Sequence, residues 1–147
     1  MVYAFQKVYP ELGITHDATT EMLHMQVCER FKPFLFNVID ALIDGDFVIE
    51  GFRMPLPDLF QQYGSTHQIF CFGYPNTTPK NKIADCRKFD TGNWTVGLSD
   101  EELTKTFTFL IGESKREEGL CKEFGIPFFN TGSDYTSTIQ SALRMVR

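Results

Sequence analysis

The sequence lacks the features that mark two common classes of protein. Its fourteen Lys and Arg residues form no basic stripe and the net charge is −5, so binding to nucleic acid is not expected. No apolar run approaches the roughly 20 residues that a membrane-spanning helix needs, and no signal peptide is visible at Met1. These absences predict a cytoplasmic protein that binds neither nucleic acid nor membranes.

Closely spaced metal ligands are also missing. The cysteines lie at 28, 71, 86 and 121 and include no C-x-x-C pair, whereas a zinc site needs clustered Cys or His. The three histidines form no His-x-x-x-His pair and accompany no motif of a catalytic triad. We therefore expect free thiols in a reducing cytosol and no metal site.

The composition is that of a globular protein. Hydrophobic residues make up 42% of the 147 residues, and fifteen of them are Phe, so we expect one domain with an aromatic-rich core. Short apolar runs alternate with segments of helical periodicity. The runs are 46–50, 68–72 and 126–129, and the helical segments are 20–44, 55–63, 78–90, 99–124 and about 133–146. This alternation predicts an α/β fold of three layers, with a parallel sheet and helices on both faces.

Local signals fix several boundaries of these elements. Ser99 and Glu102 form a capping box at the start of one helix, and Gly125 can end it. Ser133 can cap the last helix. Phe70 and Phe128, in the apolar runs, are expected to be buried in central strands.

A carboxylate and an arginine follow the first apolar run, as Glu50 and Arg53. Ligands bind at the carboxyl ends of strands in open α/β sheets, so this pair is a candidate site. A carboxylate there can accept a proton or orient a metal-bound water, and an Arg can clamp a phosphate with two hydrogen bonds. The alternative is a surface ion pair at the end of a strand.

Three segments together resemble adenylate-kinase-like P-loop kinases. Gly51-Phe52-Arg53 is similar to the Gly-Phe-Pro-Arg element that follows a strand in that family, although the Pro is missing here. Residues 121–131 resemble the last strand of small P-loop kinases, and residues 93–103 resemble the helix that follows the lid. The resemblance covers about residues 37–147. It implies a fold of P-loop kinase type, incomplete at the N-terminus, in which residues 1–147 are one domain with a lid-like insertion at about 78–98.

The resemblance also implies an activity and its residues. The parent enzyme would use ATP and Mg²⁺ to transfer a phosphoryl group to a small-molecule acceptor, such as a nucleoside or nucleotide. Glu50 would act as the acid/base or magnesium-orienting group, and Arg53 would bind the acceptor's phosphate. Arg87 and Arg116 would be catalytic residues of the lid, where they stabilise the transferred charge. The alternative for both arginines is a solvated helix face.

The phosphate-binding loop of that family is missing. No G-x-x-x-x-G-K-[ST] run occurs, so we do not expect this chain alone to bind Mg-ATP. We interpret the chain as a fragment or a degenerate relative of such a kinase; the alternative is a non-catalytic binding or interaction protein. A third reading is an unrelated α/β enzyme that uses Glu50 and histidines. The central strand between 46–50 and 68–72 is also missing. Direct pairing, residues 1–5 or a second chain could replace it, and we expect a gap that is visible or poorly filled.

Overall fold

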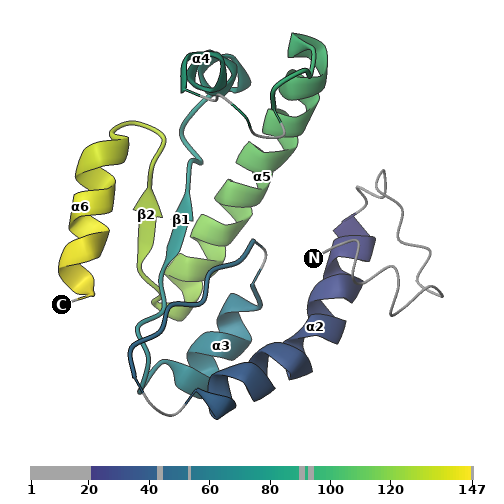
Figure 1. Ribbon diagram of the computed structural model, residues 1–147. Coiled ribbons are helices and arrows are strands. Elements are labelled where there is room, and N and C mark those ends of the chain that lie inside the picture. The colour runs from purple at the N-terminus through teal and green to yellow at the C-terminus, as the bar shows by residue number, and fades with distance from the viewer. Residues whose placement is uncertain (1–20, 43–44, 53, 90–91, 93–94, 147) are drawn as a thin grey trace. The chain divides into compact units, whose positions relative to one another are not determined.

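The structure is a computed structural model that describes residues 21–42, 45–52, 54–89, 92 and 95–146 (Figure 1). These residues form helices α2 (Glu21–Ala41), α3 (Leu56–Tyr63), α4 (Pro79–Phe89), α5 (Asp100–Phe124) and α6 (Tyr135–Met145), and strands β1 (Cys71–Gly73) and β2 (Phe128–Asn130). The chain divides into two compact units, Met1–Pro55 and Leu56–Arg147, which are described separately. The expectation that residues 1–147 form one domain, with a lid-like insertion at about 78–98, stays a prediction.

The predicted three-layer parallel sheet of P-loop kinase type is wrong. The described residues are mostly helical, and the sheet they form has two strands. The run at 46–50 forms no strand, and its Val48 is 85% exposed. A helix satisfies its own backbone hydrogen bonds, whereas an apolar run becomes a strand only where a neighbouring strand pairs with it. Among the described residues, this run has no such neighbour.

In the Leu56–Arg147 unit, β1 and β2 pair in parallel, and Cys71, Phe72 and Gly73 stand opposite Phe128, Phe129 and Asn130. The helices α4 and α5 connect them, as parallel strands require a long crossover. Two of the three predicted strands therefore exist, but they are shorter and begin two or three residues later than expected. The expected burial of Phe70 and Phe128 is wrong, because both side chains are only partly buried.

The two ends of α5 follow the sequence closely. Ser99 Oγ accepts a hydrogen bond from the N–H of Glu102, and the Glu102 carboxylate accepts one from the N–H of Ser99, which completes the predicted capping box. At the other end Gly125 adopts the left-handed conformation, with φ of 70°. At α6 the prediction was one residue early, since Asp134 rather than Ser133 caps the helix.

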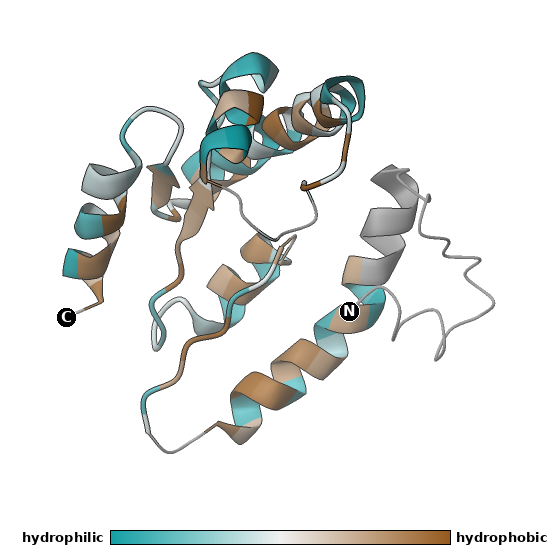
Figure 2. Ribbon diagram, turned by 45° about the horizontal axis from the view of Figure 1, so that its top comes forward, coloured by the Kyte–Doolittle hydropathy of each residue, from teal (hydrophilic) through white to brown (hydrophobic). Residues whose placement is uncertain are grey.

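One hydrophobic cluster of this unit lies between α4 and α5. Leu103, Phe107 and Ile111 are buried on α5, and Ile83 and Cys86 of α4 pack against them. In α6, hydrophilic residues lie on one side and hydrophobic residues on the side toward the strands (Figure 2). The segment predicted to form the lid therefore contains a helix that contributes to the core.

The Met1–Pro55 unit contains α2, which confirms the helix predicted for residues 20–44. Pro33 lies inside this helix, and the rings of Phe31 and Phe34 pack with their centroids 5.5 Å apart. Gly45, just beyond the helix, has a positive φ of 89°, a conformation that glycine adopts without strain.

Candidate functional site

The carboxyl ends of β1 and β2 lie at one edge of the sheet, because the strands are parallel (Figure 1). From this edge β1 continues through residues 74–78 into α4, and β2 continues through residues 131–134 into α6. Two helix N-termini therefore follow directly from the two strand ends. In open α/β sheets this edge is where ligands bind.

Hydrogen bonds hold the two loops of this edge together. The backbone N–H and the hydroxyl of Thr131 both donate to the carbonyl oxygen of Gly73, at 2.7 and 3.0 Å. The Asn130 side-chain oxygen accepts from the N–H of Gly132 at 2.9 Å, and Thr138 Oγ1 donates to the Asn130 carbonyl at 2.9 Å. These contacts fix the position of the 131–134 loop beside the end of β1.

The two helix N-termini at this edge differ in charge. At α6 the carboxylate of Asp134 accepts from the N–H of Ser137 at 2.9 Å, so a negative charge already occupies that end. At α4 the neutral hydroxyl of Thr78 accepts from the N–H of Asn81 at 3.2 Å. Because a helix N-terminus attracts anions, the α4 end is the better place for an additional negative group.

Lysine side chains add positive charge near the start of α4. Lys80 lies in its first turn and is exposed. Lys82 Nζ lies 4.7 Å from the centroid of the Tyr74 ring and 3.9 Å from Asp85 Oδ2. Burial raises the pKa of Tyr74 above its ordinary value, so this phenol stays neutral near pH 7. The resulting arrangement is a cation above a neutral aromatic ring, directly after β1.

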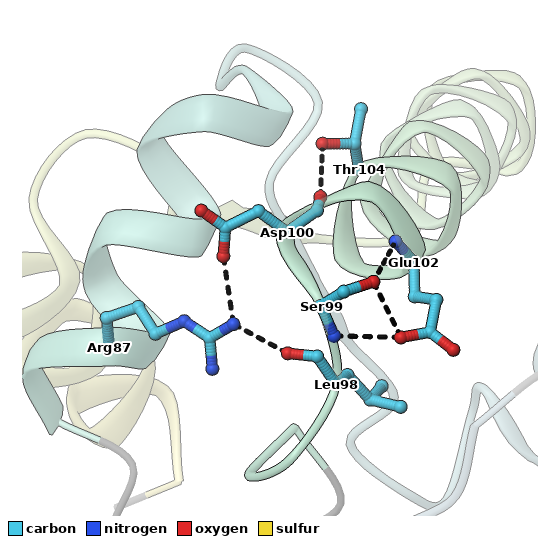
Figure 3. Close-up of polar contacts among 6 residues, drawn as sticks. All are labelled: Arg87, Leu98, Ser99, Asp100, Glu102 and Thr104. Carbon is cyan, nitrogen blue, oxygen red and sulfur yellow. Dashed lines mark hydrogen bonds and ion pairs between the residues drawn. The ribbon is translucent and has the colours of Figure 1, made fainter.

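Arg87 lies in the last turn of α4, where it contacts the start of α5 (Figure 3). Its Nη2 donates to the carbonyl oxygen of Leu98 at 2.6 Å and to Asp100 Oδ1 at 2.8 Å. Arg87 was predicted to act on a transferred phosphoryl group. The structure shows it joining two helices, and its lid role stays a prediction.

Arg116 lies within α5 and is paired with a carboxylate of the same helix, Glu113 Oε2, at 3.3 Å. Ser114 faces the strand, because its hydroxyl accepts from the N–H of Tyr74 at 3.3 Å. Arg116 follows two residues later, about 200° around the helix, and so leaves the helix on the side away from β1.

The structure does not bring Arg87 and Arg116 together. Arg87 is held at Asp100, and Arg116 lies sixteen positions further along α5. At 1.5 Å per residue this separation is about 24 Å along the helix axis. The catalytic role of Arg116 also stays a prediction.

The predicted pair after the first apolar run is only partly described. Glu50 is exposed and lies in the Met1–Pro55 unit, in a segment that forms no strand. Arg53 lies outside the described residues. The roles predicted for Glu50 and for Arg53 therefore stay predictions.

The four cysteines form no disulfide in the described residues, and two of them meet between β1 and α5. The thiols of Cys71 and Cys121 contact each other, and Cys71 Sγ lies 3.8 Å from Glu117 Oε2. Burial, reinforced by the nearby Glu117 carboxylate, raises the pKa of both thiols. Thiolates are therefore scarce at neutral pH, and the pair is poorly suited to nucleophilic chemistry.

The residues present do not fit Mg-ATP bound in the way that the family resemblance implies. The sequence has no phosphate-binding loop. In the described ranges, no group of three or more His, Cys, Asp or Glu side chains is placed to hold a metal ion.

Sequence reasoning missed the edge formed by residues 74–78 and 131–134. The signal was available in the sequence, since the polar run Asn130-Thr131-Gly132-Ser133 directly follows the apolar run 126–129. The rule that ligands bind at the carboxyl ends of strands was applied to Glu50 and Arg53, which follow a run that is not a strand. Applied to β1 and β2, the same rule finds this edge.

No family model, no curated protein and no solved structure matches the chain. None of the helices in the described ranges is long and apolar enough to cross a membrane. A function must therefore be argued from the geometry of the strand ends and from the charges around them.

Proposed function

We propose that the chain binds the phosphate group of a small molecule, such as a nucleotide, at the carboxyl edge of β1 and β2, and that it does not transfer phosphoryl groups by itself. The observation that carries this proposal is the placement of the α4 N-terminus, with Lys80 and Lys82, directly after β1. The hydrogen bonds from Thr131 to Gly73 fix the 131–134 loop beside the end of β1 without the help of a ligand.

The physical basis is electrostatic. The first N–H groups of a helix point along its axis and carry partial positive charge, which favours a phosphate. Two lysines near the same helix end add full charges, although exposed lysines bind phosphate only as point charges. We therefore expect weak binding, with a dissociation constant on the order of 1 mM, or about 4 kcal/mol of binding free energy.

The separation of the two arginines supports the absence of catalysis. Phosphoryl transfer depends mostly on positioning and on charge stabilisation around one phosphoryl group. Arg87 and Arg116 are each paired with a carboxylate, and Asp100, which holds Arg87, lies far along α5 from Arg116. Without a phosphate-binding loop, no other described group takes over that positioning.

Titration followed by amide NMR tests this proposal on the full chain, with AMP, inorganic phosphate and Mg-ATP as probes. We expect millimolar binding of AMP and phosphate, with shifted amide signals in residues 74–82. The double variant Lys80→Ala/Lys82→Ala should weaken binding at least fivefold. Lys105→Ala, which removes an exposed lysine of α5, should leave binding unchanged.

Two results would contradict the proposal. One is binding of Mg-ATP at low micromolar concentration, which would require a phosphate site that this edge does not supply. The other is binding of AMP and phosphate that the double lysine variant leaves unchanged, because the site would then lie elsewhere.

A second candidate is a fragment of an ATP-dependent phosphotransferase, in which Glu50, Arg53, Arg87 and Arg116 act as predicted once a phosphate-binding loop is supplied. The observation that favours it is the parallel pairing of residues 71–73 with 128–130, two segments whose order the family resemblance accounts for. Reading the coding sequence upstream of Met1 would test it, since a Gly-rich loop ending in Lys-Ser or Lys-Thr would favour this candidate. Transfer of phosphate from ATP to nucleosides or nucleotides by the present chain would overturn the first proposal.

A further inference from the structure

The outer edge of β1 is unpaired in the described part of the chain. Toward β2, the N–H of Cys71 donates to the carbonyl of Pro127 at 2.9 Å, and the carbonyl of Gly73 accepts from Thr131. Successive residues of a strand direct their backbone groups to opposite sides, so those of Phe70 and Phe72 point to the outer edge. No described backbone group bonds to them, and the Phe72 carbonyl accepts only from Cys71 Sγ, at 3.6 Å.

The face of the sheet that adjoins this edge is aromatic. Cys71 and Gly73 are directed toward α5, as the contacts of Cys71 with Glu117 and of Gly73 with Ser114 show. The rings of Phe70, Phe72 and Phe129 gather on the other face, with centroids 5.4 to 5.7 Å apart. Phe72 is nevertheless 42% exposed. An apolar surface therefore continues to the unpaired edge.

Apart from the short length of β1, the described residues of this edge have no charged side chain and no Pro that would hinder pairing with another strand. Natural edge strands are blunted by charged residues, by Pro or by bulges. Residues 68–73, Gln-Ile-Phe-Cys-Phe-Gly, contain no charge and no Pro. The chain has a net charge of −5, so two copies repel each other at long range. The segment 68–73 adds no charge of its own to an interface.

The segment also matches its own antiparallel copy. Phe70 and Phe72 flank Cys71 symmetrically, so an antiparallel pair centred on Cys71 places each Phe70 opposite Phe72 of the second copy. These are the residues with outward backbone groups, and each such pair exchanges two hydrogen bonds. Cys71 of the two copies would form the non-hydrogen-bonded pair between them. All four Phe rings would lie on one face.

We propose that two copies of this chain associate through the outer edges of β1, which pair antiparallel about Cys71. The order of strands in the dimer is β2-β1-β1-β2. Such an interface is isologous, because the same residues contribute from both copies. It converts a two-stranded sheet, which is marginal in isolation, into a four-stranded sheet with a continuous aromatic face. This proposal is independent of the phosphate site.

Sedimentation velocity over a wide range of concentrations tests the proposal. The mass of the full chain should rise from one to two copies of 16.9 kDa as concentration increases. Phe72→Lys places a charge on the edge and should weaken the dimer at least tenfold. The matched control is Phe89→Lys, which charges an equally apolar side chain, 67% exposed in α4, and should leave the dimer unchanged. A chain that stays monomeric, a dimer that tolerates Phe72→Lys, or equal weakening by Phe89→Lys would overturn the proposal.

Hydrogen exchange of the unmodified chain gives a second test that does not depend on a variant folding. The amides of Phe70 and Phe72 should exchange more slowly as concentration rises, because the second copy accepts their hydrogen bonds. The amide of Ile126, which already donates to the Cys121 carbonyl at 2.8 Å, should not change with dimerisation. Dimer formation without added protection of Phe72 would place the interface elsewhere and overturn the proposal.

Discussion

Arg87 Nη2 lies 2.8 Å from Asp100 Oδ1 and so joins the last turn of α4 to the first residue of α5. The same nitrogen donates to the Leu98 carbonyl, which lies in the connection between the two helices. The Arg87 side chain is 44% exposed and the Asp100 side chain 74%, so water screens the ion pair. The contact between Arg87 and Asp100 therefore stabilises the protein only modestly. The two directed hydrogen bonds of Arg87 contribute more to stability than the attraction between the charges does.

Arg87→Ala should lower the free energy of unfolding by about 1 kcal/mol, because both hydrogen bonds are lost while exposure limits the effect. Arg87→Lys should recover only part of the loss, since an ammonium does not reproduce the guanidinium geometry. Chemical denaturation provides the measurement. Lys105→Ala is the control, because it breaks an ion pair whose two side chains are largely exposed, and it should cost less than about 0.5 kcal/mol. Equal losses of unfolding free energy in Arg87→Ala and Lys105→Ala would show that the contacts of Arg87 add nothing to stability.

Ser99→Ala should destabilise the protein by about 1 kcal/mol, because the capping box loses the oxygen that accepts the Glu102 N–H. Thr108→Ala, which removes an exposed hydroxyl from the same helix, is the control and should change stability by less than about 0.5 kcal/mol. The two variants can be compared by urea unfolding. If Thr108→Ala lowers the free energy of unfolding as much as Ser99→Ala does, the capping box makes no specific contribution to stability.

The capping box should also make the free energy of unfolding depend on pH in the acidic range. Hydrogen bonds from Ser99 lower the pKa of Glu102 below its ordinary value near 4.3. The folded state then binds this proton only at lower pH than the unfolded state does. The stabilisation that the ionised Glu102 provides is therefore present above pH 4.3. It is lost as the pH falls through the pKa that Glu102 has in the folded state. Unfolding measured from pH 6 to pH 2 should show a shallower decline in Ser99→Ala than in the unmodified chain.

Gly73→Ala should cost about 1–3 kcal/mol through overpacking. A Cβ at this position would lie 2.6 Å from Cζ of Phe128, whose ring lies between β2 and α5. Gly112→Ala is the matched control, since nothing lies within 4 Å of its Cβ position in the middle of α5. That change should stabilise the protein by about 0.5–1 kcal/mol. Thermal unfolding should therefore shift in opposite directions, and shifts of the same sign would contradict the packing described for β1.

The buried thiols should make the protein lose stability at alkaline pH. Burial raises the pKa of Cys71 and of Cys121, so the folded state keeps these protons at a pH where the unfolded chain has released them. The unfolded state binds fewer protons above about pH 8.5, and stability must fall as pH rises beyond that value. Chemical denaturation from pH 7 to pH 10 should show a smaller decline in the double variant Cys71→Ala/Cys121→Ala. An unchanged slope in that variant would contradict this assignment.

Local signals in the sequence predicted the helices well and the sheet poorly. The capping box at Ser99 and the left-handed Gly125 act within a few residues, so they can be recognised without knowledge of the fold. The run Phe47-Val48-Ile49 is as apolar as the runs 68–72 and 126–129, which contain strand residues, yet it forms no strand. Strand formation depends on a partner that is distant in sequence, and composition alone does not reveal that partner.

The candidate site shows the same limit. Arg87 and Arg116 both belong to charge-rich helices, and the sequence does not show that α5 separates them. Their carboxylate partners differ as well: Glu113 is a local partner three residues away, whereas Asp100 is reached only because α4 folds back onto α5. Only the partner of Arg116 could be inferred from helical spacing.

The 25-residue length of α5 has a consequence for how the Leu56–Arg147 unit responds to change. At 1.5 Å per residue the helix is about 37 Å long, with the capping box at one end and the thiol contact near the other. Substitutions more than about 10 Å apart that share no partner usually have additive effects on stability. The free energies lost in Ser99→Ala and in Cys121→Ala should therefore sum in the double variant. The two ends of this helix therefore contribute independently to the stability of the unit.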